Sequence, residues 1–240
     1  MRKIVFVFTL LVSIQSFSQW PWQKIEGNGK IKKGSRSASN YSAIASSGSW
    51  DVMIAYGESN SIEVEGDDNL LSYIETNVEN GKLNIKTTKS VNLRSKNRIT
   101  IYVSLKKLTG IFLSGSGDIM GVGNFSNDGK TDFKISGSGS IKVSFDKINT
   151  TEIVISGSGN IGLVGSASTV NVKISGSGNA DCSALICEAA TAHISGSGNV
   201  KVYTNRSIDA SISGSGNVQY KGPASDIKKH ISGSGRVVKA

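Results

Sequence analysis

The sequence is poor in the residues that most often carry catalysis or bind metals. Only two histidines and two cysteines occur in 240 residues. It contains no His-Glu-x-x-His motif, no zinc-type cysteine spacing and no Gly-x-Ser-x-Gly nucleophile elbow. His193 and His230 occupy the same place in a repeat described below but stand two repeats apart, too far to share a metal ion. The sequence therefore indicates no cofactor, no metal site and no catalytic residue.

Aromatic residues are also few, at 7% of the chain, while the formal net charge is +9. The charge is uneven: acidic side chains are concentrated in residues 58–79 and basic ones in residues 82–107. A basic chain that binds nucleic acid usually interleaves aromatic and basic residues or carries a basic helix, and neither pattern is present. We therefore expect no nucleic-acid partner. Solubility and an anionic polysaccharide remain as explanations of the charge.

Long hydrophobic runs are missing after residue 18, so no membrane-spanning segment is predicted there. The first 18 residues read as a secretory signal peptide. Arg2 and Lys3 precede the apolar run 4–12, and Ser16 and Ser18 supply small residues at the cleavage site. We expect a mature chain from Gln19, exported to the periplasm, the cell surface or the medium.

What the sequence does have is the motif Ser-Gly-Ser-Gly, seven times in its second half. The spacings are 22, 20, 19, 20, 18 and 19 residues, which suits one turn of a solenoid. Apolar residues alternate on both flanks, which indicates half-buried strands joined at a glycine-rich corner. The column immediately before the motif consists of Leu113, Ile135, Ile155, Ile174, Ile194, Ile212 and Ile231. The sequence predicts a right-handed, single-stranded parallel β-helix over 108–240, with turns of about 20 residues.

The residue that follows each motif is polar, and four consecutive copies have asparagine. They are Asn160, Asn179, Asn199 and Asn217. Asparagine tolerates corner conformations, and stacked copies form amide ladders, so the column has a structural interpretation. The other interpretation is a ligand-facing stripe, which makes these four residues the candidate binding face.

The cysteines, Cys182 and Cys187, also allow two interpretations. Export permits a disulfide between them. Cys182 nevertheless occupies an inward column of the repeat, where a free thiol is an ordinary core residue.

Residues 19–107 lack the complete motif but remain strand-like, and we expect them to form a more irregular β region that caps the solenoid. Ser47-Gly48-Ser49-Trp50-Asp51 looks like a degenerate corner. Residues 70–74 suggest a short helical turn, and Asn80-Gly81 predicts a hairpin between 74–78 and 83–87.

These features together resemble the head GIN domain family, whose members are described as adhesin heads of auto-transporters and are common in Bacteroidetes. The resemblance rests on Gly27-Asn28-Gly29-Lys30, the turn at 48–52, the segments 66–74 and 81–85, and the repeated Ser-Gly-Ser-Gly-Asn. It covers nearly all of the predicted mature chain. It implies a right-handed β-helix on an exported protein and implies no known activity. From a sequence that ends at Ala240 without a membrane barrel, we expect a departure from a complete auto-transporter.

Two functions follow as alternatives. The first is a non-catalytic surface or envelope module that presents a repetitive polar face to a glycan or an envelope protein. The second is a carbohydrate-active enzyme, a lyase or hydrolase, with a groove along the helix. A glycosidase needs two facing carboxylates, and those of the repeat half are scattered over different columns. The sequence therefore favours the binding module.

Overall fold

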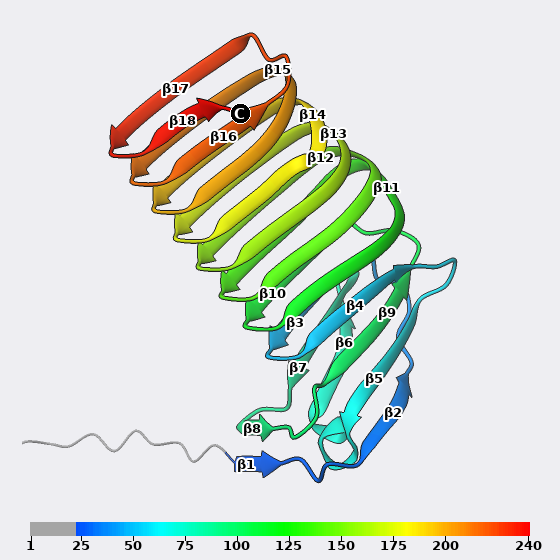
Figure 1. Cartoon of the computed structure of the whole chain (residues 1–240). Coiled ribbons are helices and arrows are strands. Elements are labelled where there is room, and N and C mark those ends of the chain that lie inside the picture. Colours follow the sequence, from blue (N-terminus) through cyan, green and yellow to red (C-terminus); the bar gives the residue numbers. More distant parts are fainter. Residues whose placement is uncertain (1–22) are drawn as a thin grey trace, which may run out of the picture.

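The computed structural model describes residues 23–240, so the predicted signal peptide lies outside the described residues. Figure 1 shows a stack of similar turns that ends at the C-terminus, joined to a less regular group of strands at the other end. The predicted β-solenoid and its irregular N-terminal β region are both confirmed. We refer to residues 108–240 as the repeat region and to residues 23–107 as the N-terminal region.

The middle turns of the repeat region are each one long strand that bends around the core and leads into the next corner, and the last turns are divided into shorter strands (Figure 1). The strands are β10 (Gly110–Gly115), β11 (Asp118–Gly137), β12 (Ser140–Gly157), β13 (Asn160–Gly176), β14 (Asn179–Gly196), β15 (Asn199–Gly214), β16 (Asn217–Lys221), β17 (Asp226–Gly233) and β18 (Arg236–Lys239). All pairings among them are parallel.

The turns stack in register, so the motifs form one column of corners. Ile135 pairs with Ile155, Ile155 with Ile174, and Ile174 with Ile194, and all four side chains are buried. The predicted apolar column is therefore confirmed. Register shifts fall instead at the bend of each strand, for example between Ser144 and Ile148, where turn length varies.

The corners need glycine because successive turns approach closely there. The first glycine of the seven motifs has a positive φ, between +118° and +136°, which residues with a side chain rarely adopt. At Gly196 an added Cβ atom would lie 2.5 Å from the carbonyl oxygen of Gly176. Both the conformation and the space exclude larger residues.

The N-terminal region mixes parallel and antiparallel strands. It contains β1 (Gln23–Glu26), β2 (Ile31–Arg36), β3 (Ala43–Gly48), β4 (Asp51–Tyr56), β5 (Ser61–Asp67), the 3₁₀-helix η1 (Asp68–Tyr73), β6 (Ile74–Glu79), β7 (Lys82–Thr87), β8 (Val91–Arg94) and β9 (Thr100–Leu105). The predicted helical turn and the β6–β7 hairpin are confirmed.

The column of corners begins earlier than residue 108. Strand β3 pairs in register with β10, and β4 pairs with β11, so Ser47–Trp50 forms the first corner of the stack. Beyond it, β7 and β9 continue the parallel pairing, and β6, β5 and β2 then add antiparallel strands. Strand β9 lies between β4 and β5, a pairing that hydrophobic alternation did not indicate. Antiparallel strands thus end the solenoid at this side.

The opposite end carries a charge in place of an apolar residue. Lys229 aligns with Ala210 of the preceding turn, in an inward column. Its Nζ atom lies 3.0 Å from the carbonyl oxygen of Val237, to which it donates a hydrogen bond. The same atom lies 5.9 Å from the centre of the Tyr220 ring. The ammonium group therefore covers the last layer of the core.

Candidate functional site

The four predicted asparagines lie one above another, directly after their corners. Each is the first residue of its strand, from β13 to β16. The parallel register pairs Asn160 with Asn179, Asn179 with Asn199, and Asn199 with Asn217. The side-chain amides form a continuous chain of hydrogen bonds. Nδ2 donates to the Oδ1 atom of the preceding turn at 2.8 Å from Asn179, 2.9 Å from Asn199 and 3.0 Å from Asn217. We call this row the asparagine ladder.

The ladder also leaves hydrogen-bonding capacity for a ligand. A primary amide has two N–H donors and an oxygen with two lone pairs. An amide inside the ladder uses one donor and one lone pair on its neighbours, so one of each remains. Because the ladder holds the amides in one orientation, a ligand would not have to order them on binding. The structural and functional interpretations of the column are therefore compatible.

A groove runs beside three of the four asparagines. Its volume is about 520 Å³, and Asn179, Asn199, Asn217, Asp181, Lys201, Gln219 and Arg236 supply its polar lining. Val200 and Val238 add apolar contacts. Asn160 belongs to the ladder but does not line the groove. The structure thus places the candidate face at the C-terminal half of the repeat region.

Charges of both signs border this groove. Burial by itself raises the pKa of Asp181, but hydrogen bonds from Ser183 and the positive charges of Lys201 and Lys221 outweigh it, so the net pKa is lowered. Asp181 is thus a carboxylate at neutral pH. It is the one acidic side chain in the lining of this groove. A glycoside hydrolase of the usual type needs two such groups flanking one bond.

The histidines occupy one outward column, as their sequence positions indicate. His193 pairs with Ser211, which pairs with His230, so the two histidines are two turns apart, with Ser211 between them. In residues 23–240 no group of three or more His, Cys, Asp or Glu side chains is arranged to hold a metal ion. Nor does any helix in that range have the length and hydrophobicity to span a membrane.

The structure shows both cysteines as buried free thiols. In the structure the two cysteines are therefore core residues and do not form a disulfide. Burial raises the pKa of both thiols, that of Cys187 to about 11. The Sγ atom of Cys187 donates to the carbonyl oxygen of Tyr203 at 3.3 Å. Neither thiol has the lowered pKa that a nucleophilic cysteine requires.

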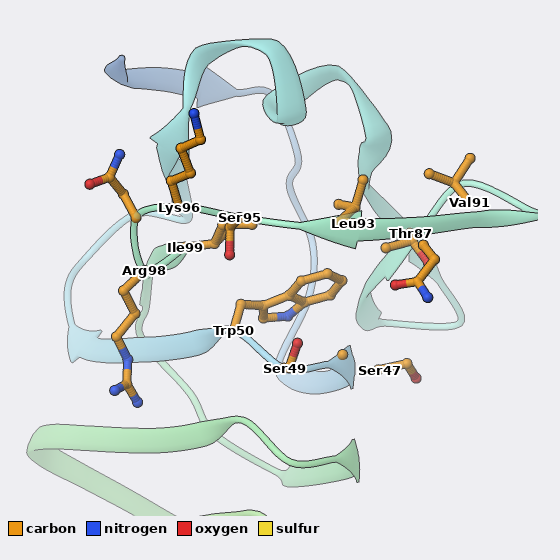
Figure 2. A pocket seen from close by; sticks show the side chains of 13 residues that line it. Ser47, Ser49, Trp50, Thr87, Val91, Leu93, Ser95, Lys96, Arg98 and Ile99 are labelled. Carbon is orange, nitrogen blue, oxygen red and sulfur yellow. The ribbon is translucent and has the colours of Figure 1, made fainter. Parts of the chain in front are cut away.

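A second hollow, of about 780 Å³, lies in the N-terminal region (Figure 2). It separates the first corner, Ser47–Trp50, from residues 91–99. Arg98 is held at its edge by Asp51, which accepts hydrogen bonds from Nε and Nη2. This pairing raises the pKa of Arg98. The sequence pattern indicates the degenerate corner but not this hollow, because Trp50 and Arg98 are 48 residues apart in the chain.

The family model described as "Putative auto-transporter adhesin, head GIN domain" matches residues 40–224. No curated protein matches this chain. Among solved structures, a putative adhesin from Bacteroides fragilis superposes with a TM-score of 0.82 at 22% identity, covering 90% of this chain and 100% of its own.

Two further solved structures have the same fold. A putative lipid binding protein from Parabacteroides distasonis has a TM-score of 0.72 at 27% identity, covering 91% of this chain and 100% of its own. A putative adhesin from Parabacteroides merdae has a TM-score of 0.69 at 21% identity, covering 91% of this chain and 99% of its own. The match thus extends over both the repeat region and most of the N-terminal region.

Proposed function

Because this chain belongs to the head GIN domain family, we propose that it is an exported, non-catalytic binding module of the cell surface or envelope. Its ligand is a glycan that lies in the groove along the asparagine ladder. The predicted signal peptide over residues 1–18 supports export, and the adhesin descriptions of the family and of similar structures support a binding role.

The observation that carries the proposal is the row of amides held in one orientation by the bonds between Asn179, Asn199 and Asn217. Consecutive turns offer the same donor and acceptor at the spacing of parallel strands, about 4.8 Å. A polymer of hydroxyl-bearing units can meet several of these groups at once, and weak contacts then add by multivalency. A groove with a single carboxylate suits binding better than hydrolysis.

A binding array of glycans and envelope components, probed with the exported protein, tests this proposal. The double variant Asn179→Lys and Asn199→Lys fills the groove with two long charged side chains. We expect its affinity for a bound glycan to fall about tenfold or more, which corresponds to at least ~1.4 kcal/mol. The matched control is Asn171→Lys with Thr191→Lys. These two residues pair on β13 and β14, ahead of the same two corners that Asn179 and Asn199 follow, and they do not line the groove.

Equal loss in the two double variants would contradict the assignment of this face, as would binding to a protein or a lipid vesicle with no glycan bound. The lipid arm is included because one similar structure is described as a putative lipid binding protein.

The same panel should be assayed for turnover. Replacing His193 and His230 with alanine should leave binding intact, whereas polysaccharide cleavage abolished by one Asp or Glu substitution would establish the alternative, a carbohydrate-active enzyme.

A further inference from the structure

We infer that the ligand of the asparagine ladder is amphipathic: a glycan that carries an alkyl or acyl chain, which is the chemistry of a glycolipid. This rests on the proposed function, because it adds a second part to the ligand of the same groove. Three observations carry it: an apolar hollow beside the groove, the continuity of the two, and the shape of the hollow.

The hollow has a volume of about 420 Å³ and lies on strands β11 to β14. Most of the residues that line it are apolar. Three of them expose large side chains to solvent: Val122 is 72% exposed, Val164 49% and Met120 38%. A single exposed apolar side chain is common on any protein, but several around one hollow indicate a place where a ligand or partner binds.

The hollow is continuous with the groove along the ladder, and Asp181 lines both. The parallel register forms one column from β11 to β15, which consists of Met120, Lys142, Gly162, Asp181 and Lys201. Asp181 and Lys201 follow the ladder residues of their turns by two positions, so the column runs beside the ladder. A ligand on the ladder that extends past Asp181 toward β11 therefore enters the hollow, which continues over three more strands, or roughly 14 Å.

The surface changes from polar to apolar at Asp181. On the groove side, successive turns present amides and the charges of Lys201 and Arg236. On the other side, Lys142 is the one basic residue in the lining. A Cβ atom added at Gly162 would lie 3.7 Å from Cγ of Lys142, so the lysine stem passes beside the glycine. Such a stem is apolar, while its ammonium group stays in water. The ligand that matches this surface is polar at one end and apolar at the other.

The shape of the hollow favours a chain over a second protein surface. Its volume is in the range of small-molecule pockets. A stable dimer buries about 800 Å² on each partner, and three partly exposed apolar side chains supply only a fraction of that area. Gly162 leaves a gap in the column between Lys142 and Asp181, which a flat protein face would leave empty. A flexible alkyl chain fills such a gap and packs its methylene groups against Val164.

The length of the chain should determine the gain in affinity. Complete burial of one methylene group strengthens binding about fourfold. The hollow is open on one side, so each methylene group loses about half of its contact with water, and the gain is about twofold. Four methylene groups in contact therefore add about tenfold or slightly more.

The test titrates maltose, n-hexyl maltoside and n-octyl maltoside into the full chain, with each detergent kept below its critical micelle concentration. NMR signals of the methyl groups of Met120, Val122 and Val164 report on the hollow, and the side-chain amide signals of the ladder report on the sugar. We expect all three probes to shift the amide signals, and only the alkyl maltosides to shift the methyl signals. The octyl compound should bind about tenfold more tightly than maltose, with the hexyl compound between them.

The double variant Val122→Ser and Val164→Ser tests the apolar contact. We expect it to reduce the advantage of n-octyl maltoside over maltose to about threefold or less, and to leave the affinity for maltose unchanged. The matched control is Ile31→Ser with Ile231→Ser, which also removes two exposed apolar side chains, on β2 and β17, outside the hollow. The control should keep the full advantage. Equal losses in the two double variants would overturn the inference.

The two sets of NMR signals separate this inference from the proposed function. Methyl signals that n-octyl maltoside does not shift would overturn the inference alone if the ladder amides still respond to sugar. Methyl shifts with unmoved ladder amides would overturn both, because the hollow would then bind alkyl chains without a glycan on the ladder. A dimer in sedimentation that Val122→Ser with Val164→Ser converts to monomer would also overturn the inference, since a second copy would then cover the hollow.

Discussion

The repeat region and the N-terminal region solve the same problem, the stacking of parallel turns, in different ways. In the repeat region each turn copies its neighbour, so one interaction is used many times: an isoleucine on an isoleucine, a glycine carbonyl under two N–H groups. The N-terminal region depends on single side chains that occur once. The comparison shows that repetition distributes stability over many equal contacts, whereas the irregular end concentrates it in a few.

Asp67 is the clearest of these single contacts. Its buried carboxylate accepts hydrogen bonds from the backbone N–H groups of Gly29, Lys96 and Asn97, and from Nδ2 of Asn97, at 2.7 to 3.2 Å. It thereby joins the loop after β1, the end of β5 and the loop before β9. The side-chain bonds that link turns in the repeat region instead recur from one turn to the next, as in the asparagine ladder.

The largest effect is expected from a charge in the shared core of the repeat region. Ile174→Asp places a carboxylate between Ile155 and Ile194, where it has no partner, and should lower the free energy of unfolding by about 4 kcal/mol. Lys173→Gln, one residue away and exposed, should change it by less than about 0.5 kcal/mol. Chemical denaturation compares the two, and similar midpoints would show that the inward and outward faces are wrongly assigned.

Replacing a corner glycine with alanine should destabilise the protein less than Ile174→Asp does, but more than the same change at a glycine outside the corners. In Gly196→Ala the alanine would have to adopt a positive φ, and its Cβ atom would lie against the carbonyl oxygen of Gly176. We therefore expect the free energy of unfolding to fall by about 3 kcal/mol. Gly162→Ala is the control, because an added Cβ atom would make an ordinary contact of 3.7 Å with Lys142. There the change should be neutral or stabilise by about 0.5 kcal/mol, since alanine is less flexible in the unfolded chain. Thermal unfolding of both variants checks the contrast.

In the N-terminal region, Asp67→Asn should cost about 2 kcal/mol, because the bonds to a charged acceptor are replaced by weaker ones and one amide donor faces other donors. The loss should appear as faster hydrogen exchange in β1, β8 and the loop at 95–99, with β12–β14 unaffected. Asp68→Asn is the control, since Asp68 is exposed and lies 3.5 Å from Lys32 in a surface ion pair. Uniform loosening of both regions would argue that they unfold as one unit.

The same carboxylate should make this region sensitive to acid. Burial raises the pKa of Asp67, but the hydrogen bonds from Asn97, Lys96 and Gly29 outweigh it and hold the net pKa below the ordinary value of 3.8. Because the pKa is lower in the folded state, the stabilisation is complete above about pH 4 and is lost as the pH falls through the folded value. Exchange measured between pH 5 and pH 3 should show the N-terminal region opening first in the wild type, and no such step in Asp67→Asn.

The smallest effect is expected at the cysteines. Both thiols are buried and unbonded, and burial raises the pKa of Cys187 to about 11. A reducing agent should therefore leave the melting temperature unchanged, and neither thiol should react with iodoacetamide under native conditions at pH 7. A lower melting temperature on reduction would indicate a disulfide, contrary to the structure.

The sequence predicted the repeat region well because its information is periodic. The column through Ile174 and the Asn179 to Asn217 row can be read from spacing alone, and both are present. The N-terminal region was predicted only as separate pieces. That β9 lies between β4 and β5, and that Asp67 binds residues about 30 positions away, depends on contacts that no local pattern encodes. The groove could be anticipated only as a row of polar residues. Arg236 continues the asparagine row, and Asp181 pairs with Lys201 two residues beyond it, but whether these side chains enclose a hollow depends on packing that spacing alone does not determine.

The charge of Lys229 in the last inward column affects whether a further turn can stack on the end of the solenoid. A solenoid whose final turn matched the others would offer a second copy of the chain a ready surface for continued growth into a fibre. Burying the ammonium group under another turn would require removing its water without supplying a counter-charge. The charge therefore disfavours the stacking of another turn on β17, whereas the internal turns, whose inward columns are apolar, stack without that cost.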